Sequence, residues 1–121
     1  MPPNVKSILL NVWIYRSAFL VALAMAMYWA IEPFHRGPAM FAYQDKVGHA
    51  LAFFLLTMLL DLSRWFDKKS LQVLLLATYG VVIEAVQYFI PHRSTEFADF
   101  VADALGIFLY FIVRSRINPN R

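Results

Sequence analysis

Four long apolar stretches dominate this chain and limit what it can fold into. They run over about 10–31, 46–65, 71–90 and 97–114, and short polar segments separate them. A helix that crosses a bilayer needs about 20 mostly apolar residues. The pattern therefore predicts an all-α integral membrane protein whose four transmembrane helices form an antiparallel bundle.

The composition supports this interpretation. The chain is 60% apolar and 16% charged, whereas a soluble domain is normally about 45–50% apolar and about 25% charged. The remaining segments are too short to bury a core of their own, so we expect a single transmembrane domain over residues 1–121. There is no Cys, which excludes disulfides and Cys-ligated metals. The net charge of +3 comes without a basic run interleaved with aromatics, so no nucleic acid partner is expected.

The distribution of Lys and Arg predicts the orientation, because cytoplasmic loops carry an excess of these residues. With the N-terminus inside, three basic residues lie outside, namely Arg36, Lys46 and Arg93. Eight lie inside, namely Lys6, Arg16, Arg64, Lys68, Lys69, Arg114, Arg116 and Arg121. We therefore expect an N-in/C-in, multi-pass protein with residues 32–45 and 91–96 outside.

This orientation brings polar residues from three helix ends to the outer leaflet. Ionisable groups within a membrane are costly and usually mark functional sites. The candidate ligand-binding or functional residues are Asp45, Lys46, His49, Glu84, Gln87, Arg93, Asp99 and Asp103. Their number and shared depth predict a polar cluster, and any catalytic role within it is left open.

Helical spacing predicts that these residues face the interior of the bundle. Glu84 follows Gly80 by four positions, and Asp103 precedes Gly106 by three, so the members of each pair share a helix face. Small residues let membrane helices approach closely, which makes Gly80 and Gly106 the expected packing positions.

A structural role is the alternative for several candidates. Asp45, Lys46 and Asp99 lie near the membrane interface, where charged helix ends are ordinary, and the two acids also suit the first turn of a helix. Gln87 could serve as an interhelical hydrogen-bonding residue. Glu84, which lies deeper between apolar neighbours, is the candidate for which function is favoured most.

Taken in order, these residues resemble the VanZ-like family. The matching elements are Asp45-Lys46-x-x-His49, Glu84-x-x-Gln87, Pro91-x-Arg93 and Asp99-x-x-x-Asp103-x-x-Gly106. The family commonly has Asn where this chain has Asp103. The resemblance implies a small bacterial protein of the inner (cytoplasmic) membrane. It also implies a link to the cell envelope, because the name-giving member is associated with low-level resistance to the glycopeptide teicoplanin.

Three functions are compatible with the cluster, and recognition of a lipid headgroup or lipid-linked envelope precursor is favoured. A phosphate could bind Lys46, Arg93 and His49, since an arginine fork donates two hydrogen bonds. The acids could then orient hydroxyls or amines of the ligand. A structural or accessory subunit of a membrane complex is a second possibility, because buried polar groups can specify packing. A homo-oligomer is compatible with so thin a bundle.

An intramembrane acid/base or metal-dependent enzyme is the remaining alternative. His49, Glu84 and Asp103 are the metal candidates, since His and carboxylates can bind Zn or Mn. The chain has no HExxH, GxSxG or Walker motif, and basic residues in the cluster disfavour a metal, so no cofactor is expected. No polar path is expected through the inner half of the membrane, where Thr57 is the only polar residue expected in the second apolar stretch.

Overall fold

A computed structural model describes residues 5–31, 44–90 and 97–117. Within these ranges the chain forms four α-helices and no strand: α1 (Val5–Ile31), α2 (Gln44–Ser63), α3 (Lys69–Tyr88) and α4 (Phe97–Ile117). The predicted all-α class is confirmed. Each helix lies within five residues of its predicted bounds, and α1 begins five residues earlier than predicted because the helix includes the polar segment around Lys6.

The ends of α2 and α3 follow from local backbone chemistry. Arg64 adopts a left-handed conformation with a φ of 57° directly after α2, and its N–H donates to the Asp61 carbonyl at 3.3 Å. Left-handed residues of this kind commonly terminate helices. The last turn of α3 closes with a 3.2 Å bond from Phe89 N–H to the Val86 carbonyl, shortly before Pro91 in the sequence.

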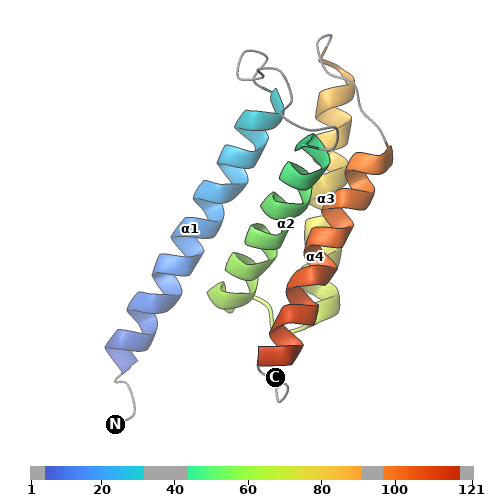
Figure 1. Cartoon of the computed structure of the whole chain (residues 1–121). Coiled ribbons are helices and arrows are strands. Elements are labelled where there is room, and N and C mark those ends of the chain that lie inside the picture. The colour runs from blue at the N-terminus through green and yellow to red at the C-terminus, as the bar shows by residue number, and fades with distance from the viewer. Residues whose placement is uncertain (1–4, 32–43, 91–96, 118–121) are drawn as a thin grey trace.

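The helices share two common ends (Figure 1). The end of α1, the start of α2, the end of α3 and the start of α4 lie at the upper end of the view, and the other helix ends lie at the lower end. α2 contacts the three other helices, and α4 packs against α2 and α3. In the described part of the chain, α1 contacts α2 and α3 but not α4. α2 is therefore the central helix.

The core follows α2. Phe53, Leu56 and Leu60 of α2 are fully buried with Leu76 of α3 and Ile107 of α4. α2 and α4 approach closely at Gly106, where an added Cβ would overlap the carbonyl oxygen of Ala50. This backbone approach leaves room only for glycine.

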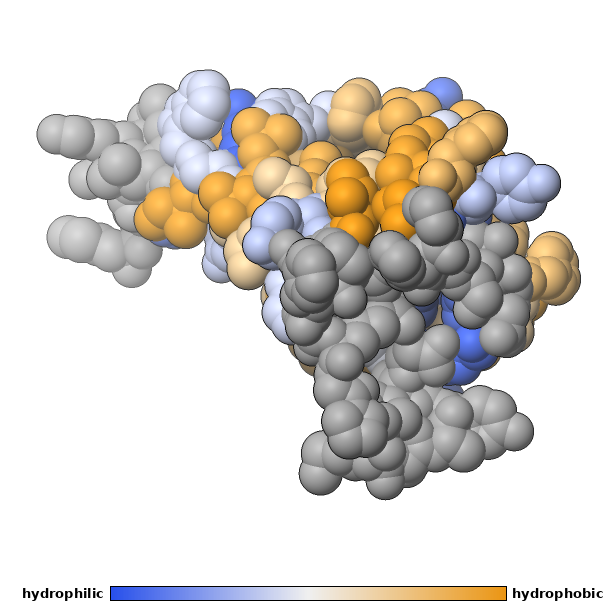
Figure 2. Space-filling view, turned by 90° about the horizontal axis from the view of Figure 1, so that it is seen from above, coloured by the Kyte–Doolittle hydropathy of each residue, from blue (hydrophilic) through white to orange (hydrophobic). Residues whose placement is uncertain are grey.

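The outer surface of the helices is apolar, in contrast to the surface of a soluble protein. Leu105, Phe108 and Ile112 of α4 are each more than half exposed, and Figure 2, seen from above, shows many hydrophobic side chains among the residues that are not grey. An open groove of about 640 Å³, lined almost entirely by apolar groups including Leu23 and Val82, runs between α1 and α3. Exposed apolar patches this extensive mark membrane or protein contacts.

Within the described ranges, three helices are long and apolar enough to cross a membrane, and the candidate spans are Asn11–Ile31, Lys46–Ser63 and Lys69–Tyr88. α4 is similar in length but carries two acids and two arginines, namely Asp99, Asp103, Arg114 and Arg116. α4 therefore carries more charged residues than the other three helices and is not among those counted as apolar enough to cross a membrane.

Candidate functional site

An ion pair joins α2 to α4 at the upper end of the bundle. Lys46 lies in the first turn of α2 and Asp99 in the first turn of α4. Lys46 Nζ lies 2.8 Å from Asp99 Oδ1, and the Asp99 side chain is largely buried. The opposite charges of Lys46 and Asp99 therefore offset each other at this level of the bundle.

A second polar pair lies one turn deeper along the same interface. His49 Nδ1 lies 2.8 Å from Asp103 Oδ1, and Asp103 is only 1% exposed. His49 follows Lys46 by three residues and Asp103 follows Asp99 by four, so each helix presents its two residues on one face. The two pairs are therefore stacked between α2 and α4.

Glu84 of α3 completes the deeper layer. One potential ligand atom each from His49, Glu84 and Asp103 lies within 4.8 Å of the other two. Gly80, one turn before Glu84, makes this approach feasible, because a Cβ there would lie 3.1 Å from Asp103 Oδ2. Five residues thus form what we call the acidic site, and they are Lys46, His49, Glu84, Asp99 and Asp103.

The acidic site contains acceptor atoms that no donor satisfies. Glu84 Oε1 and Asp103 Oδ2 are buried and have no hydrogen-bond partner within the described ranges. Buried polar atoms in proteins are nearly always bonded to protein, water or an ion. The site is therefore chemically suited to accept hydrogen bonds from a ligand or to coordinate a cation.

The remaining predicted site residues lie elsewhere or outside the description. Gln87 points to α1, where its Nε2 donates to the Ala30 carbonyl at 3.3 Å, so it joins α3 to α1 and is not part of the acidic site. Asp45 belongs to the first turn of α2, but its side chain lies outside the described residues. Arg93 also lies outside them.

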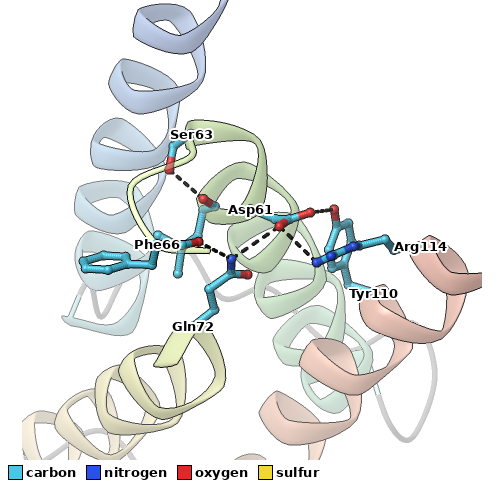
Figure 3. A network of polar contacts seen from close by, with 7 residues as sticks. Asp61, Ser63, Phe66, Gln72, Tyr110 and Arg114 are labelled. Atoms are coloured by element: carbon cyan, nitrogen blue, oxygen red, sulfur yellow. Dashed lines mark hydrogen bonds and ion pairs between the residues drawn. The ribbon is translucent and has the colours of Figure 1, made fainter. Parts of the chain in front are cut away.

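A second polar cluster occupies the lower end of the bundle, and the sequence analysis missed it (Figure 3). Asp61 of α2 is 2% exposed. It accepts hydrogen bonds from Tyr110 Oη at 2.6 Å, Arg114 Nη1 at 3.1 Å and Gln72 Nε2 at 3.3 Å. We call these four residues the Asp61 network. The expectation that Thr57 is the only polar group in this half of α2 was wrong.

The Asp61 network differs from the acidic site because its acid is fully satisfied. Three donors from α3 and α4 converge on one carboxylate, and Gln72 also donates to the Phe66 carbonyl at 2.7 Å. An ionisable residue inside an apolar stretch was the available signal, but Asp61 alone did not indicate its partners on two other helices. The network therefore fixes the lower ends of α2, α3 and α4 to one another.

Arg16 attaches α1 to the same end. Its Nε donates to the Ser63 carbonyl at 3.0 Å, and its guanidinium lies 5.2 Å and 5.3 Å from the ring centroids of Trp13 and Trp65. These distances are typical of cation–π contacts. An arginine held by two tryptophans is an arrangement suited to a membrane interface.

Apolar helices that enclose a polar site at one end define the class of this molecule, an all-helical membrane protein. The sequence model of the VanZ/LLP1 family matches residues 6–117, and the chain belongs to this family. The match covers all four helices except the first residue of α1. No curated protein and no solved structure is significantly similar to the chain.

Proposed function

We propose that this VanZ/LLP1 protein crosses the bacterial inner membrane four times and recognises a lipid headgroup or a lipid-linked envelope precursor. The acidic site would face the outer leaflet. The observation that carries the proposal is the pair of buried, unsatisfied acceptors, Glu84 Oε1 and Asp103 Oδ2. They lie beside a lysine at the end of a membrane-compatible bundle.

A transmembrane α4 is compatible with its charges. Asp99 and Asp103 are buried against the bundle, and Arg114 is bonded to Asp61. The lipid-facing side consists of residues such as Leu105 and Phe108. With the eight-to-three distribution of basic residues, alternating spans would place both termini in the cytoplasm.

The site chemistry suits a zwitterionic or hydroxylated headgroup. An amine or hydroxyl of the ligand could donate to Glu84 and Asp103, and either donor would remove the cost of an unsatisfied buried acceptor, about 1–3 kcal/mol per group. Lys46, which is paired with Asp99 between the first turns of α2 and α4, could contact a phosphate of the ligand. A ligand with phosphate and donor groups a few ångströms apart would match both layers.

A purely structural role is less well supported. A packing cluster should satisfy its charged groups, as the Asp61 carboxylate does with its three donors, although the neutral Gln72 Oε1 beside it is also buried without a partner among the described residues. In the acidic site, by contrast, the charged groups themselves are incomplete, because Glu84 Oε1 and Asp103 Oδ2 have no donor among the described residues. A role in glycopeptide (teicoplanin) resistance is supported by the family resemblance alone.

Native mass spectrometry of the mildly solubilised protein tests the proposal. The wild type should retain a lipid-sized adduct, and Glu84→Gln should lose it because the amide removes the negative charge and replaces one acceptor oxygen by a donor. Asp67→Asn, which removes an exposed acid between α2 and α3, is the matched control and should retain the adduct. Retention by Glu84→Gln, or no adduct on the wild type, would contradict headgroup recognition. Far-UV circular dichroism would verify that each variant is folded.

A further inference from the structure

The deeper layer of the acidic site brings together potential metal ligands from three helices. His49, Glu84 and Asp103 each offer one ligand atom within 4.8 Å of the others. Bonds from a metal to imidazole nitrogen or carboxylate oxygen are about 2.0–2.2 Å, so ligands on opposite sides of one ion are at most about 4.4 Å apart. The 4.8 Å limit on the observed separations is slightly wider, so the side chains would move inward when they bind an ion. We propose that these residues bind a divalent transition-metal cation of the Mn²⁺ or Zn²⁺ type.

The unsatisfied oxygens support this assignment independently of the spacing. Asp103 is 1% exposed, yet its Oδ2 has no hydrogen-bond partner in the described part of the chain. That atom faces α3, because a Cβ on Gly80 would lie 3.1 Å from it. Glu84, one turn further along α3, has a buried unsatisfied oxygen of its own. A cation between α3 and α4 would coordinate both.

The charges of the two layers also favour a divalent ion. Lys46 is paired with Asp99 at 2.8 Å, so its charge is offset within the interfacial layer. Two carboxylates and one imidazole remain in the deeper layer, and a divalent cation would neutralise the two carboxylates. The expectation that basic residues in the cluster would disfavour a metal neglected this pairing.

The donor set indicates the class of metal. One imidazole nitrogen with two carboxylate oxygens suits Zn, Mn or Fe, whereas Ca²⁺ and Mg²⁺ are bound mainly by oxygen. Three protein ligands leave a coordination position open. A headgroup phosphate could occupy that position, and this last step rests on the proposed function.

Titration of the full-length protein with a metal tests the site directly. Protein purified in detergent and stripped with EDTA is titrated with MnCl₂, free Mn²⁺ is measured by electron paramagnetic resonance, and ZnCl₂ is added as a competitor. We expect one Mn²⁺ per chain. Glu84→Gln and Asp103→Asn should each weaken binding at least about tenfold, the range seen even for outer-shell changes. Asp67→Asn should bind like the wild type.

Several results would overturn the inference. One is a wild type that binds neither Mn²⁺ nor Zn²⁺, and another is Glu84→Gln and Asp103→Asn variants that bind Mn²⁺ as tightly as the wild type. Asp103→Asn keeps the shape of the side chain and an acceptor for His49, so it tests the site without removing that contact. Lipid retained by protein that binds no metal would refute only the cation site. Metal binding without any lipid adduct would refute only headgroup recognition.

Discussion

Replacing Asp61 by Ala should destabilise the bundle more than any change at its surface. The substitution would leave three donors without their acceptor: Tyr110 Oη, Gln72 Nε2 and Arg114 Nη1. The Arg114 side chain is only 11% exposed, so its charge would remain largely buried. Removing one partner of a buried ion pair typically costs about 3–5 kcal/mol. We expect a decrease of that size in the free energy of unfolding.

Reversible unfolding by SDS in mixed micelles, followed by far-UV circular dichroism, would measure this loss. The Asp61→Leu/Arg114→Met double variant removes both charges and should recover the part of the loss that comes from the unpaired Arg114 charge, because apolar replacements of buried ion pairs are often neutral. Tyr110 Oη would still lack its acceptor. Asp67→Asn, at an exposed position, should change the free energy by less than about 0.5 kcal/mol. A loss under about 1 kcal/mol for Asp61→Ala would refute the reasoning. So would a double variant as unstable as Asp61→Ala.

Two further predictions concern packing and orientation. Gly106→Ala should lower the free energy of unfolding by about 1–3 kcal/mol, because its Cβ would overlap the Ala50 carbonyl, whereas Gly48→Ala has nothing within 4 Å of the added Cβ and should cost nothing. Equal effects in the same unfolding assay would contradict the close approach of α2 and α4. For orientation, Pro38→Cys should react with an impermeant thiol reagent in intact cells and Lys68→Cys only after permeabilisation, on a chain without native Cys. The reverse labelling would place the acidic site on the cytoplasmic side.

Much of the helical architecture could be predicted because its signals are local. Runs of about 20 apolar residues locate helices without knowledge of their neighbours, and the observed bounds of α2, Gln44–Ser63, differ from the predicted 46–65 by two residues at each end. The grouping of Lys46, Glu84 and Asp103 at one end also followed from chain order alone. Alternation of the helices brings every second helix end to the same level.

The partner of each polar side chain could not be predicted in this way. Gln87 and Glu84 lie three residues apart on α3, yet Gln87 bonds to Ala30 of α1 and Glu84 joins His49 and Asp103. Which neighbour a helix face meets depends on the rotation and offset of packed helices, and these are set by close contacts such as Gly106 against Ala50.

Hydropathy and charge along the chain were enough to predict the all-helical class, the helix positions and the end of the bundle where Lys46, Glu84 and Asp103 gather. The packing of the helices was needed to show that Lys46 is paired with Asp99, that Glu84 Oε1 and Asp103 Oδ2 lack donors among the described residues, and that Asp61 is satisfied by α3 and α4. These features depend on distances between helices. Side chains far apart in the chain acquire such distances only when the helices pack.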